Sequence, residues 1–260
     1  MIRRLGIIAC CTLLAACSPM REVKVQPVTT AMDSAAIAAG ELRIANSAMA
    51  SGDLEVALSL FQRITAAYPD NLDGWIGFGN ALYLSGDISQ ARQAYQAALE
   101  RDGNQLDALL GLARMDVRQR KLDDARLRYQ QALQAWPDNP LAMAGMGVTY
   151  DLAGDHAQAQ RIYRDGLAKH PDNPALRSNL GLSLSLSGKP REAVNVLLDV
   201  VGVPSALPQG RQNLALAYAL MGREDAAETI LLGDMPRATV EDNLTFYREV
   251  RRRMGLRETP

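Results

Sequence analysis

Apolar residues along most of the chain recur at the spacing of helices that bury one face. The unit is clearest over residues 72–105, where two short segments place apolar residues at steps of one, three and four. These positions are Trp75, Phe78, Gly79 and Leu82 in the first segment and Ala91, Tyr95 and Ala98 in the second. The pattern predicts two amphipathic helices that pack against each other.

A short turn separates the two predicted helices. Gly86 suits the left-handed residue that follows a helix end, and Asp87 suits the N-cap of the next helix. Gln90 stands three residues after Asp87, which is a capping-box signature. The unit is therefore predicted to be a helix–turn–helix.

The same unit recurs every 34 residues. Alanine marks one position of the second helix, a large residue marks another, and glycine marks the turn, with Arg120 in its place once. The positions are Ala57, Ala91, Ala125, Ala159, Ala193 and Ala227; Phe61, Tyr95, Tyr129, Tyr163, Leu197 and Leu231; and Gly52, Gly86, Gly154, Gly188 and Gly222. A fixed period of roughly 20 to 50 residues indicates a stacked repeat.

Residues 72–105 resemble a tetratricopeptide repeat, whose pattern W-x2-L-G-x2-Y…A-x3-F…A…P they follow, with Gly103 where proline is usual. The resemblance implies an all-α fold, an α-solenoid of about six such helix–turn–helix units over 35–241. The expected repeats span 38–71, 72–105, 106–139, 140–173, 174–207 and 208–241. A C-terminal capping helix and tail over 239–260 are expected to cover the open end of the stack.

The third repeat departs most from the pattern. Asp116 stands where Leu82 and Tyr150 stand in its neighbours, and arginine or lysine occupies positions 114, 118, 120 and 121. One interpretation is a charged band across the middle of the binding face. The other is a local pair between Asp116 and Arg120, which are four residues apart.

Arginines also gather in the predicted capping helix, at positions 248, 251, 252 and 253. They would either contact anionic lipid or an acidic partner, or simply suit the C-terminal end of a helix and keep the cap soluble.

Residues 1–16 are predicted to be a lipoprotein signal peptide. Arg3 and Arg4 precede a 12-residue apolar run that is too short for a stable membrane-spanning helix. The run ends in Leu14-Ala15-Ala16-Cys17, which resembles a bacterial lipobox and implies that Cys17 carries a diacylglyceryl group. Residues 17–34 lack a helical period and are expected to be a flexible tether. The alternative is an ordinary secretory signal in which Cys17 is incidental.

No catalytic, metal or cofactor motif is present, so we expect neither an enzyme nor a bound cofactor. The two histidines, His156 and His170, occupy ordinary repeat positions filled elsewhere by apolar residues, which argues against metal ligation. The formal net charge is −1, and no basic stripe is interleaved with aromatics, so nucleic acid is not an expected partner.

The resemblance places a partner-binding groove on the concave face of the first helices, with a mostly apolar, exposed lining. The expected groove residues are Leu42, Asn46, Ile76, Asn80, Tyr83, Leu110, Arg114, Val148, Asp151, Asn179, Leu182, Asn213 and Leu216. Such a stripe would hold a helix or an extended peptide of a protein client. Asn179 and Asn213 would either bond to a ligand backbone or be merely tolerated. Alternatively, the tether or a partner protomer covers part of the stripe.

The whole arrangement resembles the TadD family of lipoproteins of Flp (tight-adherence) pilus assembly, with its nearest local likeness over 211–217 and at Gly222-Arg223. The resemblance implies an outer-membrane lipoprotein, with Ser18 after the cysteine, that faces the periplasm and escorts a secretin or another pilus component. The alternatives are an adaptor for other envelope machinery (a type IV pilus pilotin, a cell-wall enzyme or a protease), and an accessory subunit of an enzyme complex.

Overall fold

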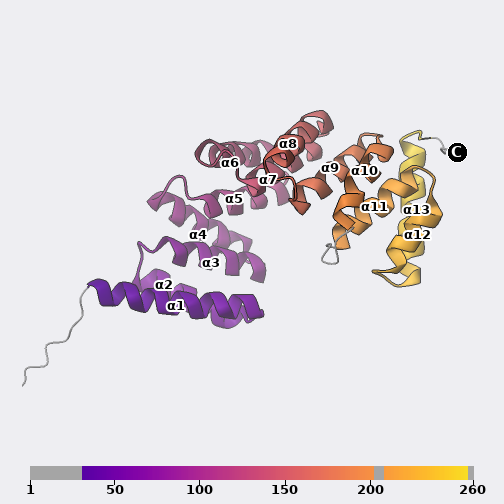
Figure 1. The fold of residues 1–260 in the computed structure, drawn as a ribbon. Coiled ribbons are helices and arrows are strands. Elements are labelled where there is room, and N and C mark those ends of the chain that lie inside the picture. Colours follow the sequence, from indigo (N-terminus) through magenta and orange to yellow (C-terminus); the bar gives the residue numbers. More distant parts are fainter. Residues whose placement is uncertain (1–30, 202–207, 257–260) are drawn as a thin grey trace, which may run out of the picture. The chain divides into compact units, whose positions relative to one another are not determined.

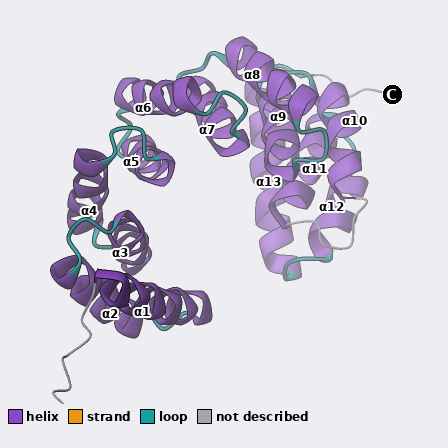
Figure 2. Cartoon of the chain, turned by 60° about the vertical axis from the view of Figure 1, so that its left-hand side comes forward, coloured by secondary structure: helices purple, strands orange, loops and turns teal. Residues whose placement is uncertain are grey.

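The computed structural model describes residues 31–201 and 208–256, with the backbone alone at 31–34, 200 and 201. Within these residues the chain forms thirteen α-helices and no strand (Figures 1 and 2). The helices are α1 Ala31–Ser51, α2 Leu54–Ala67, α3 Leu72–Ser85, α4 Ile88–Arg101, α5 Leu106–Arg118, α6 Leu122–Ala135, α7 Pro140–Leu152, α8 His156–Lys169, α9 Pro174–Leu186, α10 Pro190–Val201, α11 Pro208–Leu220, α12 Glu224–Leu232 and α13 Arg237–Arg253.

Residues 38–260 form one compact unit, and its helices stack in chain order. From α3 to α12, each odd-numbered helix packs on the even-numbered helix after it, and that helix packs on the next odd-numbered one. The odd-numbered helices from α3 to α13 also contact one another in succession. This is the packing of a tetratricopeptide solenoid, so the predicted all-α fold is confirmed.

The two ends of the helical array differ in detail from the expected bounds. Helix α1 begins at Ala31, inside the range 17–34 expected to be a tether. The rest of that range, the signal segment and Cys17 lie outside the described residues. Helix α13 begins at Arg237, and it packs on both α11 and α12 through buried Val240, Leu244 and Tyr247.

The arginines of α13 have partners within the chain. Arg252 and Arg253 lie 2.9 Å and 2.7 Å from the carboxylate of Glu249. Arg251 approaches Glu224 of α12 at 3.8 Å. None of the helices in the described part of the chain is both long and apolar enough to cross a membrane.

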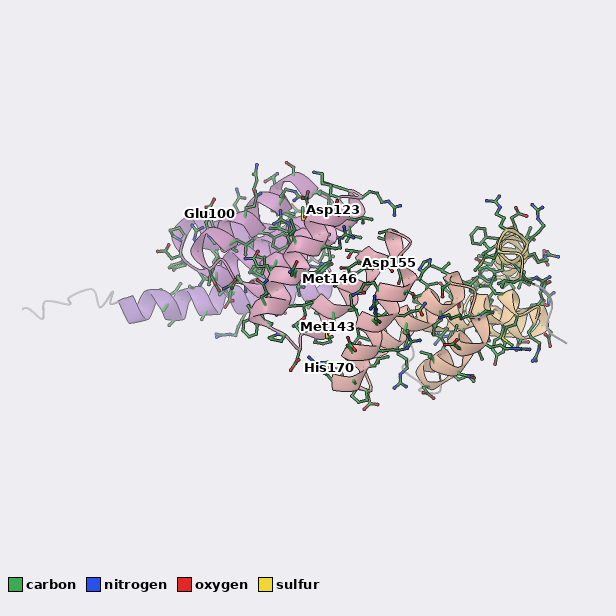
Figure 3. All side chains as sticks on the ribbon, turned by 90° about the horizontal axis from the view of Figure 1, so that it is seen from above. Glu100, Asp123, Met143, Met146, Asp155 and His170 are labelled. Atoms are coloured by element: carbon green, nitrogen blue, oxygen red, sulfur yellow. The ribbon has the colours of Figure 1, made fainter. Side chains whose placement is uncertain are left out.

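Capping side chains fix where the helices begin. Asp87 accepts a hydrogen bond from the backbone N–H of Gln90 at 3.0 Å, and Asp155 does the same for Gln158. Figure 3 labels Asp155 and His170, the residues at the two ends of α8. The turn before α4 uses Gly86 at φ 90°, a left-handed conformation that glycine adopts without steric cost.

The third turn lacks both devices. Arg120 takes the left-handed position at φ 60°, and Lys121, the N-cap of α6, makes no capping bond through its side chain. An L-residue with a Cβ is disfavoured in this region of backbone space. The charged residues that make the third repeat unusual therefore also give it the least favourable turn of the array.

Arg120→Gly is expected to stabilise the protein by about 1 kcal/mol, because glycine relieves the left-handed strain. The midpoint of urea unfolding, followed by circular dichroism, checks it. The matched control is Gly86→Arg, which creates the same strain at φ 90° and should lower the midpoint. A lower midpoint for Arg120→Gly would contradict this account of the turn.

Glycines in the odd-numbered helices leave space for aromatic rings from the even-numbered helices, which pack between two successive odd-numbered helices. Tyr95 of α4 is fully buried, and a Cβ on Gly79 of α3 would lie 2.7 Å from its ring. A Cβ on Gly111 of α5 would lie 2.5 Å from the same ring. Real Cβ contacts are not this short, so the absence of side chains at both glycines lets α3 and α5 enclose the ring. The tyrosine hydroxyl then reaches Asn80 at 2.7 Å.

The local pair between Asp116 and Arg120 was wrong, and Asp116 takes no part in a charged band on the groove. The residue is 1% exposed and faces neither the binding groove nor Arg120. Its carboxylate accepts hydrogen bonds from Arg92 of α4 at 2.8 Å and Arg128 of α6 at 2.7 Å. Asp116 therefore joins the second helices of two successive repeats from inside the stack.

Candidate functional site

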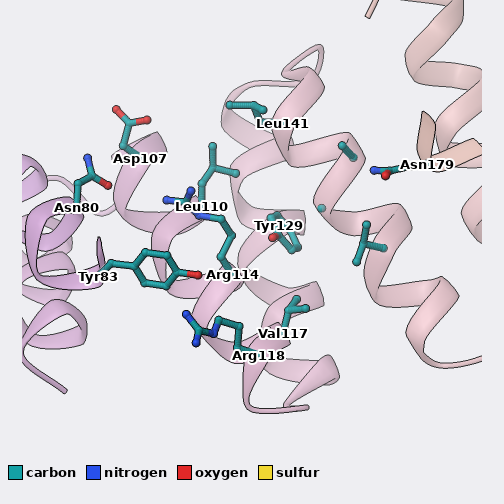
Figure 4. Close-up of a pocket in the computed structure, with 13 residues that line it drawn as sticks. Asn80, Tyr83, Asp107, Leu110, Arg114, Val117, Arg118, Tyr129, Leu141 and Asn179 are labelled. Carbon is teal, nitrogen blue, oxygen red and sulfur yellow. The ribbon is translucent and has the colours of Figure 1, made fainter. Parts of the chain in front are cut away.

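A groove of about 580 Å³ lies along the odd-numbered helices α3, α5, α7 and α9 (Figure 4). One lining residue, Tyr129, reaches it from α6. The lining consists of Asn80, Tyr83, Asp107, Leu110, Arg114, Val117, Arg118, Tyr129, Leu141, Ala144, Gly145, Val148 and Asn179. The residues from α3, α5, α7 and α9 come from one face of each helix, because the 34-residue period places equivalent positions side by side.

The structure brings together six of the thirteen expected groove residues in this groove: Asn80, Tyr83, Leu110, Arg114, Val148 and Asn179. A second pocket of about 370 Å³ between α1 and α3 is lined by Leu42, Asn46 and Ile76. Asn80 lines both, so the two adjoin. Leu182 and Leu216, both half-buried, line neither.

Asp151, expected in the groove, instead joins neighbouring helices. Its carboxylate accepts hydrogen bonds from Tyr163 at 2.9 Å and from Ser183 of α9 at 2.6 Å, and it lies 2.8 Å from the Nδ1 atom of His156. Burial is the main cause that raises the pKa of Tyr163 above its usual value, and the negative charge of Asp151 is the second. The carboxylate is thus occupied within the chain.

Asn213 was expected to meet a ligand but donates to Ser178 of the preceding repeat. Its Nδ2 atom lies 3.0 Å from the Ser178 hydroxyl and 3.3 Å from its carbonyl oxygen. Asn179, at the equivalent position one repeat earlier, lines the groove and makes no side-chain hydrogen bond with any described residue. Of the two asparagines, only Asn179 is placed to meet a ligand.

Two apolar residues that were expected to line the groove are more buried than expected. Ile76 is 8% exposed and Leu110 6%, and both belong to core clusters, so a charge at either position would disturb folding as well as binding. The exposed apolar residue of the groove is Leu141, at 62%. Leu141 is therefore the position at which the groove can be probed without disturbing the core.

Two arginines of α5 form a basic region in the groove. The guanidinium carbons of Arg114 and Arg118 lie 5.6 Å and 5.4 Å from the centre of the Tyr83 ring, which is cation–π distance. Neither makes an ion pair with any described residue. Asp107 lines the groove two turns earlier on the same helix. One part of the expected charged band therefore exists, formed by Arg114 and Arg118 without Asp116.

The expected list lacked seven residues of the lining: Asp107, Val117, Arg118, Leu141, Ala144, Gly145 and Tyr129. Val117, Ala144 and Gly145 stand 34 residues from Tyr83, Leu110 and Asn179, which were on the list, so the 34-residue period could have found them. Tyr129 is 3% exposed and comes from a second helix, so its pattern marked it only as core. Its place in the groove depends on Gly145, whose missing side chain leaves the hydroxyl uncovered: a Cβ there would lie 2.6 Å from it.

Comparisons with known proteins agree with this fold. A family model described as the middle TPR-like domain of cilia and flagella-associated protein 70 matches residues 42–169, and a tetratricopeptide repeat model matches residues 152–202. No curated protein shows significant sequence similarity to the chain.

Several solved structures have a similar fold. Pseudomonas aeruginosa pilF is 14% identical, with a TM-score of 0.66 over 78% of this chain and 92% of its own. PilW, described as a widely conserved type IV pilus biogenesis factor, is 15% identical, with a TM-score of 0.67 over 84% of this chain and 98% of its own. YrrB, described as a TPR protein with an unusual peptide-binding site, is 17% identical, with a TM-score of 0.50 over 75% of this chain and 97% of its own.

At such identities the likeness shows the fold alone. Together with the repeat-model match and the stacked helix pairs, it identifies the chain as a tetratricopeptide-repeat protein, built on a scaffold for protein–protein interaction.

Proposed function

We propose that this protein captures a segment of a protein client in the groove along α3 to α9 and carries out no chemistry on it. The observation that carries the proposal is the groove itself, with an apolar floor, the exposed Leu141 and two arginines without ion-pair partners in the described chain. An apolar groove with a few polar groups suits a helix or an extended peptide.

The second part of the proposal is that the protein works at the outer membrane, held by lipid on Cys17 and facing the periplasm. The support is the sequence of residues 1–17, with its paired arginines, short apolar run and lipobox-like end. Anchoring would raise the effective concentration of a client at the membrane without adding any contact.

The third part is that the client belongs to Flp (tight-adherence) pilus assembly, with an outer-membrane secretin as the first candidate. The TadD resemblance supports this, as do the similar folds of pilF and PilW. Because PilW is described as a type IV pilus biogenesis factor, a type IV pilus role is the second candidate.

Cys17→Ser tests the anchor. Several acyl chains hold a protein durably on a bilayer, whereas this variant has no acceptor thiol at position 17. The variant should move from the membrane fraction to the soluble periplasmic fraction and lose incorporation of labelled palmitate. A variant that is still labelled would show that Cys17 is not the lipidated residue.

Affinity purification of the crosslinked full-length protein from its native cells, followed by mass spectrometry, tests the client. Recovery of an Flp secretin or other Flp pilus proteins would support the first candidate, and type IV pilus proteins the second. Recovery of cell-wall enzymes or proteases instead would contradict the pilus assignment while leaving the scaffold intact.

A further inference from the structure

We propose that the groove contains a subsite for an acidic side chain, aspartate or glutamate, within the client segment, formed by Arg114, Arg118 and the hydroxyl of Tyr129. The inference rests on the proposed capture of a client in this groove and adds the chemistry that the client must present.

The first observation is the Tyr129 hydroxyl. Tyr129 is 3% exposed and makes no hydrogen bond with any described residue, although it lines the groove (Figure 4). The equivalent tyrosines are both bonded: Tyr95 to Asn80 at 2.7 Å and Tyr163 to Asp151 at 2.9 Å. None of the described residues has a fully buried side-chain polar atom without a partner, so the unbonded Tyr129 hydroxyl is open to the groove, where it can bond to a ligand.

The reason for the missing partner can be read from the repeat. The position of Asp151 in the fourth repeat is held by Val117 in the third, and the position of Asn80 in the second is held by Arg114. Valine has no acceptor and arginine has only donors. The third repeat has therefore replaced both of the acceptors that its neighbours give to this tyrosine.

The second observation is the pair of arginines on α5. Arg114 and Arg118 are one turn apart on the same face, and each lies over the ring of Tyr83. Neither forms an ion pair with any described residue, whereas Arg92 and Arg128, on the neighbouring helices, both do. The Tyr83 ring thus lies beside two cations of the groove that have no ion-pair partner among the described residues.

The third observation is that each of these groups can donate a hydrogen bond. Burial raises the pKa of Tyr129 to about 12, against the opposing charge of Arg114, so the phenol keeps its proton at neutral pH. Two guanidiniums and a protonated hydroxyl can each donate a hydrogen bond to a shared acceptor, and a carboxylate forms the strongest such bonds. Arg114 and Tyr129 both line the groove (Figure 4).

The surrounding lining defines the rest of the segment. Asp107 lies seven residues before Arg114 on α5, which is roughly 10 Å along the helix. A bound acidic residue therefore belongs at the C-terminal end of α5, away from Asp107. Leu141, Val148 and Leu110 line the adjoining groove, so apolar residues are expected next to the acidic one. The inferred occupant is an internal, acidic–apolar segment of a protein chain.

The test is a selection of short random peptides displayed on phage against the purified full-length chain. Displayed peptides are fused at their C termini, so only side chains can supply a carboxylate. The selected peptides should share an aspartate or glutamate with apolar neighbours. Replacing that residue by its amide in a synthetic capped peptide should weaken binding about tenfold, as expected for the loss of one charge-assisted pair.

Variants locate the effect. In Arg114→Gln/Arg118→Gln, the acidic peptide and its amide should bind equally. Tyr129→Phe should weaken the acidic peptide several-fold with an unchanged melting temperature, because its hydroxyl has no partner in the described chain. Arg161→Gln, an exposed arginine of α8 outside the groove lining, is the matched control and should change nothing.

Selection without an acidic residue, no selection at all, or an equal penalty for the amide in the arginine variant would overturn the subsite. Those results would leave the proposed function standing if a client still crosslinks to the groove in cells. Failure of that crosslink while acidic peptides bind would overturn the function and leave the subsite.

Discussion

Replacing both arginines that hold Asp116, in Arg92→Ala/Arg128→Ala, should lower the free energy of unfolding by about 3–5 kcal/mol. The double substitution leaves a carboxylate that is 1% exposed without either of its cations, and an unpaired buried charge is strongly destabilising. Urea unfolding followed by circular dichroism measures the loss.

Asp116→Leu is the matched control, because it removes the buried charge itself. Leu82 holds the equivalent position one repeat earlier, and Arg92 and Arg128 are partly exposed, so both can turn to water. Replacing a buried ion pair by an apolar residue is often nearly neutral, so a change within about 1.5 kcal/mol is expected. An equal loss in both variants would mean that the bridge itself, and not the unpaired charge, determines the stability here.

Asp151→Ala should destabilise the protein by about 2–4 kcal/mol. Ser183 is fully buried, and both it and Tyr163 lose a charged acceptor, which costs more than a neutral hydrogen bond. Thermal and urea unfolding check the value. The expected result separates Asp151, which joins α7, α8 and α9, from the residues that only line the groove.

Asp107→Ala serves as the comparison for Asp151, since Asp107 is an exposed aspartate of the groove lining. Asp107 lies in the first turn of α5, where a carboxylate interacts favourably with the helix dipole, so a loss of about 0.3–1 kcal/mol is expected. If Asp151→Ala were equally mild, the hydrogen bonds around Asp151 would contribute little to stability.

The helical array was predictable because its signal is repeated. A spacing that recurs at every 34th residue identifies the helices, and helix starts at Leu72, Leu106, Pro140 and Pro174 keep that spacing. Local chemistry supports it, because Asp or Asn caps six of the helices and glycine occupies most of the turns within the repeats. The local signals and the repeat spacing point to the same fold, and this agreement is what makes the fold predictable from the sequence.

The site was predictable only in part, because the repeat spacing gives the position of each residue on its helix and does not give its hydrogen-bond partners. It placed Asn80, Arg114 and Asn179 in the groove, but it could not show that Asp151 is bonded to Tyr163 and Ser183. It also treated Asp116 as a surface charge, since its cations come from residues 24 positions before and 12 after it. Pairings across repeats depend on side-chain reach, which spacing along one helix does not contain.

The most direct measurement of the central claim is site-specific photocrosslinking in cells from Leu141, the exposed apolar residue of the groove. The control position is Leu127 of α6, which is 66% exposed against 62% for Leu141 but does not line the groove. A discrete crosslinked protein from position 141 that is absent from position 127 is the predicted result. Equal products from both positions, or a client reached only from position 127, would contradict capture in the groove.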